Sequence, residues 1–283
     1  MQHAPHEVQE ALGQRYAVTA QIGEGAQGYV YRATRSVATD GSPADDDVAL
    51  KIYLGDDQDE RVRREINAMR RIRHPSLATL IEAGELYLSG ERLQYCAWEY
   101  IRGMALNQRL EAGPLTMRAL AAVGRDVAGA IGAIWVDRIV HRDISPKNVM
   151  LRTGEREAVL IDLGVARHLG SPSLTAYGFS WGTPGYLSPE QCSGVRDLTC
   201  KSDIFALGIV LLECALGRHP TRGLQQQLIT SPPRAASLVP TMPAVIADLI
   251  NAMLSVRAVS RPRPDEVAAT MISYLEATAN VLP

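Results

Sequence analysis

Three oxygen-bearing side chains occur in two neighbouring segments of this 283-residue chain. Asp143 and Asn148 belong to HRDISPKN (141–148), and Asp162 ends the apolar run VLID (159–162), with Gly164 allowing a sharp turn after it. A carboxylate can act as a base, and carboxylate and amide oxygens are ligands that suit Mg²⁺. The pattern therefore predicts that Asp143 is a base beside a magnesium site made by Asn148 and Asp162.

A glycine-rich segment, IGEGAQGYV (22–30), lies near the beginning of the chain, with glycines at 23, 25 and 28. Backbone without Cβ atoms can lie close over phosphate groups. The same GxGxxG spacing occurs in Rossmann dinucleotide sites, where a helix follows. Here the β-branched and aromatic run 29–31 predicts a strand, which disfavours the Rossmann interpretation. An ordinary glycine-rich hairpin is the remaining alternative.

A lysine stands inside the apolar strand expected at VALK (48–51). Burying its ammonium group is costly unless the charge is paired. The helix expected at 59–73 offers Glu65 as the partner, and we expect Lys51 to touch two nucleotide phosphates. The alternative is that Lys51 lies on an edge strand and serves solubility.

In their order along the chain, these motifs resemble those of the eukaryotic-type (Hanks-type) serine/threonine protein kinase family, and a bacterial member in particular. The family's set is a glycine-rich loop, VAIK, a helix glutamate, HRD with a later Asn, DFG and APE. The chain has GEGAQG, VALK, Glu65, HRDISPKN, DLG and SPE in that order, over residues 16–275. Asp203 resembles the aspartate that steadies the catalytic loop, and Arg261 resembles the arginine that pairs with Glu190.

The resemblance implies an α+β, bilobal protein-kinase-like fold. A small β-rich N-lobe with one main helix is expected at 16–101 and a larger helical C-lobe at 102–278, between a frayed polar segment (1–15) and a tail (279–283). The implied activity is transfer of the γ-phosphoryl of ATP to Ser or Thr hydroxyls of protein substrates, with Mg²⁺.

The resemblance also implies residue roles. Catalytic roles fall to Asp143, Lys147, Lys51 and Glu65, and metal ligation to Asn148 and Asp162. The adenine is expected to bind backbone groups near Glu99 and Ile101. Its ring is expected to lie between the side chains of Val30, Ala49 and Met150. The full set of expected nucleotide contacts is Ile22, Gly23, Glu24, Gly25, Gly28, Val30, Ala49, Lys51, Glu99, Ile101 and Met150.

Some residues depart from the family pattern. Ser145 stands where these kinases carry a lysine, and Lys147 lies two residues later, so we expect Lys147 to supply the catalytic-loop cation. Trp98 is a bulky residue at the expected back of the adenine pocket and favours a pseudokinase. Leu163 replaces the Phe of DFG and Ser188 the Ala of APE, and both changes are expected to be minor.

The segment GTPGY (182–186) before Pro-Glu resembles that of serine/threonine kinases, where Thr183 would contact the catalytic loop. Phosphorylation of the segment before GTPGY, between Ser171 and Ser180, could regulate the enzyme, with Arg142 and Arg167 binding the phosphate. The candidate acceptors there are Ser171, Ser173, Thr175, Tyr177 and Ser180.

Hydrophobic patterning must supply the elements that position these residues. Alternation predicts strands at 16–22, 29–34, 48–53, 77–87 and 93–100, and helical periods dominate after Gly103, at 105–112, 117–137, 204–216, 243–254 and 265–278. The run SVATDGSPADDD (36–47) has little to bury and is expected to be a flexible acidic loop.

Composition narrows the class of protein. Lys plus Arg is 29 and Asp plus Glu is 31, so the net charge of −2 argues against nucleic-acid binding. The N-terminus lacks an apolar run, no apolar stretch suits a membrane span, and the four scattered cysteines favour a reducing, cytoplasmic compartment. Two rivals to a protein kinase are a pseudokinase scaffold and an aminoglycoside-type small-molecule kinase, and GTPGYLSPE disfavours the second.

Overall fold

The computed structural model describes residues 4–25, 28–37, 42–53, 66, 69–154, 157–162, 182–195 and 197–279. The described chain divides into two compact units. Unit 1 comprises the described residues up to Ile72 together with Ala78–Tyr100, and unit 2 comprises Arg73–Leu77 and the described residues from Ile101 onward.

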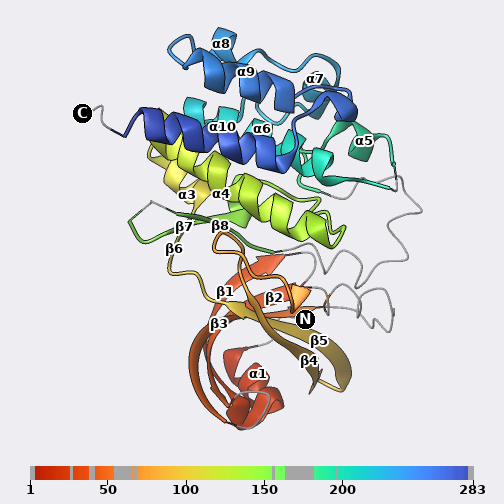
Figure 1. The fold of residues 1–283 in the computed structure, drawn as a ribbon. Helices are drawn as coiled ribbons and strands as arrows, with labels where there is room; N and C mark the ends of the chain where they lie inside the picture. Colours follow the sequence, from red (N-terminus) through yellow and green to blue (C-terminus); the bar gives the residue numbers. More distant parts are fainter. Residues whose placement is uncertain are drawn as a thin grey trace. The chain divides into compact units, whose positions relative to one another are not determined.

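Unit 1 is built on a five-stranded antiparallel sheet with the order β1-β2-β3-β5-β4 (Figure 1). All five expected strands are present, with shifted ends. Because β3 lies between β2 and β5, Lys51 is not on an edge strand, and that alternative is wrong. The strands are β1 (Tyr16–Gly25), β2 (Gly28–Val37), β3 (Pro43–Tyr53), β4 (Leu80–Leu88) and β5 (Glu91–Glu99).

The acidic segment expected to be a flexible loop is in part a strand. Residues 43–47 extend β3, where Asp46 lies opposite Arg35 and Asp47 opposite Thr34. Arg35 donates to Asp46 at 2.5 Å, and Arg32 donates to Asp47 at 3.1 Å. The expectation of a loop at these residues was wrong because basic side chains on β2 neutralise the aspartates across the ladder.

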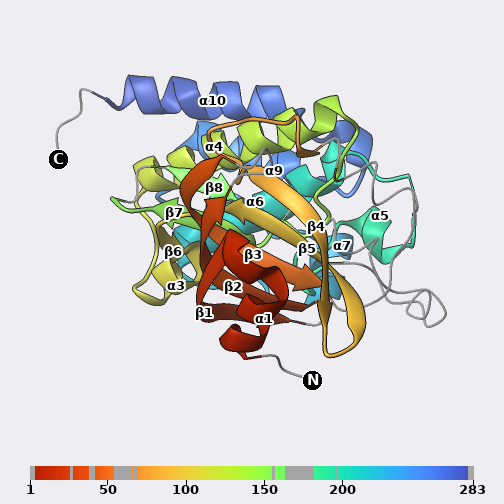
Figure 2. The same ribbon diagram turned by 90° about the horizontal axis from the view of Figure 1, so that it is seen from below.

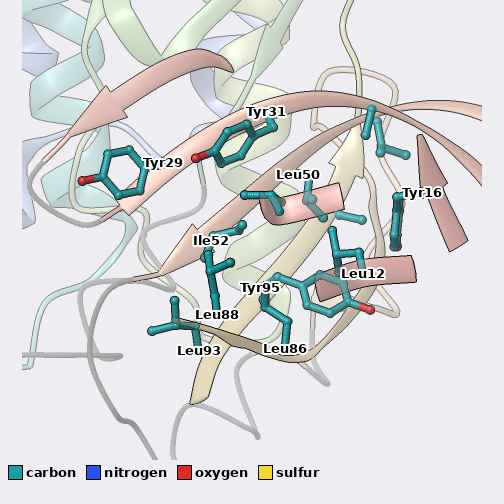
Figure 3. Close-up of a cluster of buried hydrophobic side chains, with 14 residues drawn as sticks. Leu12, Tyr16, Tyr29, Tyr31, Leu50, Ile52, Leu86, Leu88, Leu93 and Tyr95 are labelled. Atoms are coloured by element: carbon teal, nitrogen blue, oxygen red, sulfur yellow. The ribbon is translucent and has the colours of Figure 1, made fainter. Parts of the chain in front are cut away.

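The N-terminal segment also differs from expectation. Residues Pro5–Leu12 form helix α1, followed by a 3-10 turn at Gly13–Arg15, rather than a frayed end. Helix α1 packs against β1 and β4 through Val8 and Leu12, which are buried. Figure 3 shows Leu12 among the tyrosines and aliphatic side chains of the sheet. The apolar positions 8 and 12 are spaced by one helical turn, which explains the helix.

A buried carboxylate, Glu82 on β4, links β5 and the turn that follows α1. Glu82 is 4% exposed and accepts a hydrogen bond from the Tyr95 hydroxyl at 2.7 Å. Arg15 reaches the same carboxylate at 3.0 Å, and Arg35 lies 3.7 Å from it. Burial, and then hydrogen bonding to Glu82, raises the pKa of Tyr95 to about 12.

Unit 2 contains a small sheet and most of the helices (Figures 1 and 2). The antiparallel sheet has the order β6-β7-β8. Strand β7 follows the HRDISPKN segment, and β8 comes shortly before Asp162. The five expected helices are present within a few residues of their predicted ends. The elements are β6 (Gly103–Ala105), α3 (Leu106–Glu111), α4 (Met117–Val136), β7 (Val149–Arg152), β8 (Ala158–Leu160), α5 (Pro189–Cys192), α6 (Cys200–Leu216), α7 (Gln225–Thr230), α8 (Ala235–Leu238), α9 (Ala244–Met253) and α10 (Pro264–Ala277).

Helix α4 packs along α10 and against α6. Both ribbon views show α4 and α10 side by side. A Cβ atom on Gly124 would lie 2.8 Å from Met271, so the two helices approach closely at that glycine. By length and composition α4 could cross a membrane, but 56% of its apolar window is buried in the protein, which accounts for its apolar character.

The helix expected at 59–73 lies mostly outside the described residues. Ile66 and Met69 are helical and buried, and Arg70 donates its backbone N–H to Ile66 at 3.0 Å. Glu65 lies outside the described residues.

Candidate active site

Asp203 fixes the backbone of the HRD segment in unit 2. Its carboxylate, 1% exposed on α6, accepts the backbone N–H groups of His141 and Arg142, both at 2.9 Å. Arg142 has a φ of 69°, a left-handed conformation that is rare outside glycine and needs such support. Burial raises the pKa of Asp203, and His141 and the two backbone hydrogen bonds oppose this. The expected role of Asp203 in steadying this loop therefore has a direct geometric basis.

The buried ring of His141 joins the two segments that carry the site residues. Its Nδ1 accepts the N–H of Asp143 at 3.3 Å, and its Nε2 lies 3.0 Å from the Ile161 carbonyl oxygen. Since Nδ1 faces a donor and Nε2 faces an acceptor, the neutral ring carries its proton on Nε2. A second link is the Ile161 N–H, which donates to the Asn148 carbonyl at 2.9 Å.

The Asp143 carboxylate is held by two partners. Thr183 donates both its backbone N–H (2.7 Å) and its hydroxyl (2.6 Å) to Oδ1. Asn148 Nδ2 donates to Oδ2 at 3.0 Å and to the Asp143 backbone oxygen at 2.8 Å. The prediction from the sequence that Asp143, Asn148 and Thr183 lie together is confirmed. Their hydrogen bonds fix the direction in which the Asp143 carboxylate points.

The same bonds settle the orientation of the Asn148 amide. Both acceptors beside Nδ2 are oxygens, so the NH₂ group must face Asp143 and Oδ1 must face away. That oxygen, with the carboxylate of Asp162, makes the hard donor set that suits Mg²⁺. Asp162 has a φ of 56°, so its backbone turns sharply directly after the β8 segment. The residues present therefore fit the expected metal.

The two unusual positions of the catalytic loop differ in exposure. Lys147 is exposed and makes no hydrogen bond or ion pair within the described ranges, so its ammonium is accessible. Ser145 is 1% exposed, and its hydroxyl has no hydrogen-bond partner in the described part of the chain.

Comparison with known proteins supports the same family. The model of the protein kinase domain matches residues 16–271. The chain belongs to the protein kinase family. This kinase is 35% identical over 248 residues to the serine/threonine-protein kinase PkaA of Streptomyces coelicolor, covering 81% of this chain and 45% of PkaA.

Other bacterial relatives agree. The kinase is 32% identical to PknL of Mycobacterium tuberculosis, over 84% of this chain and 60% of PknL. It is also 32% identical to PrkC of Bacillus subtilis, over 83% of this chain and 36% of PrkC. Both relatives are named serine/threonine-protein kinases, and the chain spans about half the length of the curated relatives it matches.

In the glycine-rich hairpin of the kinase, β1 and β2 pair through Gly25 and Gly28. A strand follows the glycines, as predicted, rather than a helix. Gly28 has a φ of 143°, and a Cβ there would lie 1.9 Å from the Ile52 carbonyl oxygen. Gly28 is therefore required by close packing against β3, whatever its role toward phosphates.

The other expected nucleotide residues divide between the two units. In unit 1, Lys51 is 7% exposed, with its ammonium 5.2 Å from the centre of the Tyr53 ring, and Trp98 is buried opposite Ala49. In unit 2, Met150 lies on β7, and the N–H of Ile101 has no backbone partner within the described ranges. The remaining expected contacts lie in unit 1, on the first, second, third and fifth strands: Ile22, Gly23, Glu24, Gly25, Val30, Ala49 and Glu99.

The SPE motif of the kinase is anchored as expected. Arg261, 2% exposed, forms two hydrogen bonds with Glu190 at 2.7 and 2.9 Å. Although burial raises the pKa of Glu190, the bonds from Arg261 and Ser202 outweigh it, and the pKa is lowered. Ser188 does more than replace an alanine, because its hydroxyl accepts the Gln191 N–H and caps α5.

Gln191 was missed in the sequence. Its Nε2 donates to the Arg142 carbonyl at 3.0 Å, so it supports the catalytic loop from α5. The spacing Ser-x-x-Gln from 188 to 191 is a capping-box signal that could have placed it at a helix start. The candidate phosphate-binding and acceptor residues Arg167, Ser171, Ser173, Thr175, Tyr177 and Ser180 lie outside the described residues, as does Leu163.

Proposed function

We propose that this kinase transfers the γ-phosphoryl group of ATP to Ser or Thr hydroxyls of protein substrates. The observation that carries the proposal is the state of the Asp143 carboxylate. Thr183 places two hydrogen bonds on Oδ1, whereas Oδ2 takes one from Asn148. A carboxylate held in this way can act as a base, and an acceptor hydroxyl bound beside it would pass its proton to Asp143.

Phosphoryl transfer needs positioning and charge neutralisation more than covalent chemistry. Bound Mg²⁺ would supply the neutralisation of the phosphates. Asn148 Oδ1 and Asp162 would hold that ion, and Lys51 would bind the phosphates. Thr183 ties Asp143 to the GTPGY segment (182–186), where we expect the protein substrate to bind. These roles support a working enzyme rather than a pseudokinase.

Asp143→Ala and Asp162→Ala test the assignment. We expect Asp143→Ala to abolish transfer to protein while Mg-ATP binding largely survives, because Asp143 acts on the acceptor hydroxyl. Asp162→Ala should also weaken Mg²⁺-dependent ATP binding. Calorimetry with Mg-ATP and a radiolabelled-phosphate assay measure both, with the exposed Asp197→Ala as control. Equal binding loss in the two site variants would contradict the roles.

We also propose that the ammonium group of the exposed Lys147 neutralises the negative charge that spreads over the γ-phosphoryl oxygens during transfer. Ser145 carries no charge and is buried, so it cannot. Lys147→Ala should lower kcat by on the order of 10²–10³ with little change in ATP affinity. Adding Ser145→Lys should restore part of the rate. A near-normal kcat in Lys147→Ala would contradict the assignment.

Regulation by phosphorylation between Ser171 and Ser180 is part of the proposal, with Arg142 and Arg167 as the phosphate partners. The support is the density of hydroxyl residues there and the two arginines in the sequence. Phosphosite mapping of the active enzyme tests it. Full activity after replacement of all five hydroxyl residues would contradict it.

A further inference from the structure

Two side chains of unit 2 that no kinase motif above includes hold the backbone between Thr183 and Ser188. Gln225, the first residue of α7, accepts the Gly185 N–H at 2.8 Å and the Leu187 N–H at 3.2 Å through Oε1. Its Nε2 donates to the Leu187 carbonyl at 2.7 Å. One amide side chain thus satisfies three backbone groups of this segment.

His219, in the turn after α6, takes the fourth group. Its Nε2 lies 3.0 Å from the Gly185 carbonyl oxygen. Its Nδ1 accepts the N–H groups of Thr221 (3.2 Å) and Gly223 (2.9 Å), so Nε2 carries the proton and donates to Gly185. Gly185 is buried with a φ of 93°, and a Cβ there would lie 3.1 Å from His219 Nε2. The segment and the imidazole therefore fit closely.

Both ends of the clamped segment touch the catalytic loop. Thr183 bonds the Asp143 carboxylate at one end. At the other end Ser188 bonds Gln191, whose side chain bonds the Arg142 carbonyl. A shift in the middle of the segment would therefore move a partner of the base.

We propose that His219 and Gln225 are positioning residues that set where an acceptor peptide lies relative to Asp143. This inference rests on the proposed kinase function. Since the N–H groups of both Gly185 and Leu187 already donate to Gln225, they cannot pair with an acceptor peptide as an added strand. We therefore expect recognition along this segment to use side chains, above a backbone that the two residues hold in place.

Variants of the two side chains separate positioning from folding. Gln225→Ala removes all three bonds, and Gln227→Ala, exposed on the same helix, is the matched control. His219→Asn keeps an acceptor for Thr221 and Gly223 but is too short to reach Gly185. We expect Gln225→Ala to lower kcat/KM for a Ser or Thr peptide roughly ten- to a hundredfold, since small displacements of reacting groups cost this much. His219→Asn should cause a smaller loss. The KM for ATP should stay unchanged, because Gln225 and His219 contact none of the described residues that are expected to bind the nucleotide.

Hydrogen exchange gives a readout that does not depend on turnover. The Gly185 and Leu187 amides should exchange faster in Gln225→Ala and not in Gln227→Ala. Unchanged exchange would overturn the clamp, and faster exchange with unchanged peptide kinetics would overturn its role in acceptor placement. A fall in peptide kinetics together with weaker ATP binding and a lower melting temperature would also overturn it, as a folding effect. If the unaltered chain transfers no phosphate to any peptide, the proposed function itself fails.

Discussion

Two buried carboxylates, Glu82 in unit 1 and Asp203 in unit 2, are satisfied in different ways. Glu82 in unit 1 accepts hydrogen bonds from the side chains of Tyr95 and Arg15. Asp203 in unit 2 takes the backbone N–H groups of two consecutive residues, His141 and Arg142. Side-chain partners can adjust their rotamers, whereas backbone partners transmit any change to the path of the chain. The comparison suggests that Glu82 serves stability and Asp203 serves catalytic geometry.

Asp203→Asn should have the largest effect. The new NH₂ group must face one of the two N–H donors, so one buried donor loses its acceptor. We expect kcat to fall by about 10² because Asp143 lies next to the displaced backbone, and the free energy of unfolding to fall by about 1–3 kcal/mol. Peptide phosphorylation and urea unfolding measure these, with the exposed Asp248→Asn as control. A loss of stability with normal kcat per folded molecule would place Asp203 in the same class as Glu82.

Glu82→Gln tests the other side of the comparison. Loss of its charge weakens the contacts with Arg15 and Arg35, and we expect the free energy of unfolding to fall by about 1–3 kcal/mol. The kcat per folded molecule should not change. Glu85→Gln, on the same strand as Glu82, disturbs an exposed pair with Arg92 of β5 and should cost only about 0–1 kcal/mol. A kcat loss in Glu82→Gln with normal stability would break the distinction.

Tyr95→Phe removes one donor to Glu82 and should cost about 1 kcal/mol at neutral pH. The substitution should also change how steeply the free energy of unfolding falls at alkaline pH. Because burial raises the pKa of Tyr95 to about 12, the unfolded tyrosine ionises first, and stability is lost between about pH 10 and 12. The variant should lose less in that range. Urea unfolding from pH 7 to 12 measures this, with the exposed Tyr87→Phe as control.

Ser145→Ala should have the smallest effect and the opposite sign. A buried hydroxyl without a partner among the described residues costs free energy, so its removal should raise the free energy of unfolding, by at most about 1 kcal/mol. Ser188→Ala, which removes the cap of α5, should instead lower it by about 1 kcal/mol. A drop in stability for Ser145→Ala would mean that this hydroxyl has a partner.

The catalytic loop could be predicted from sequence because its chemistry is local. Asp143 and Asn148 are five residues apart, and their bonds depend on that short spacing. Asp203 and Thr183 lie farther away but stand in motifs of their own. Helices α3, α4, α6, α9 and α10 of unit 2 were also predictable, since their apolar residues recur at helical spacing, whereas the short helices α5, α7 and α8 were not predicted.

The polar contacts that join distant segments were not predictable. Glu82 sits in the alternating strand sequence LIEAGELYL, where one buried glutamate cannot be told from an outward-facing one. His219 and Gln225 lie in a turn and a short helix without a motif, and only the fold brings them to Gly185. Residues 43–47 were misjudged because the arginines that neutralise them belong to another strand.

The pairing of α4 with α10 has a consequence for how the chain is made. Residues 137–263 separate the two helices, so at about 5–20 residues per second a ribosome needs roughly 10 s to deliver α10 after α4. During that interval α4 is a 20-residue apolar helix without its main partner, and it has the length of a membrane span. A nascent chain stalled before Pro264 would therefore present a segment that chaperones or the membrane-insertion machinery can engage.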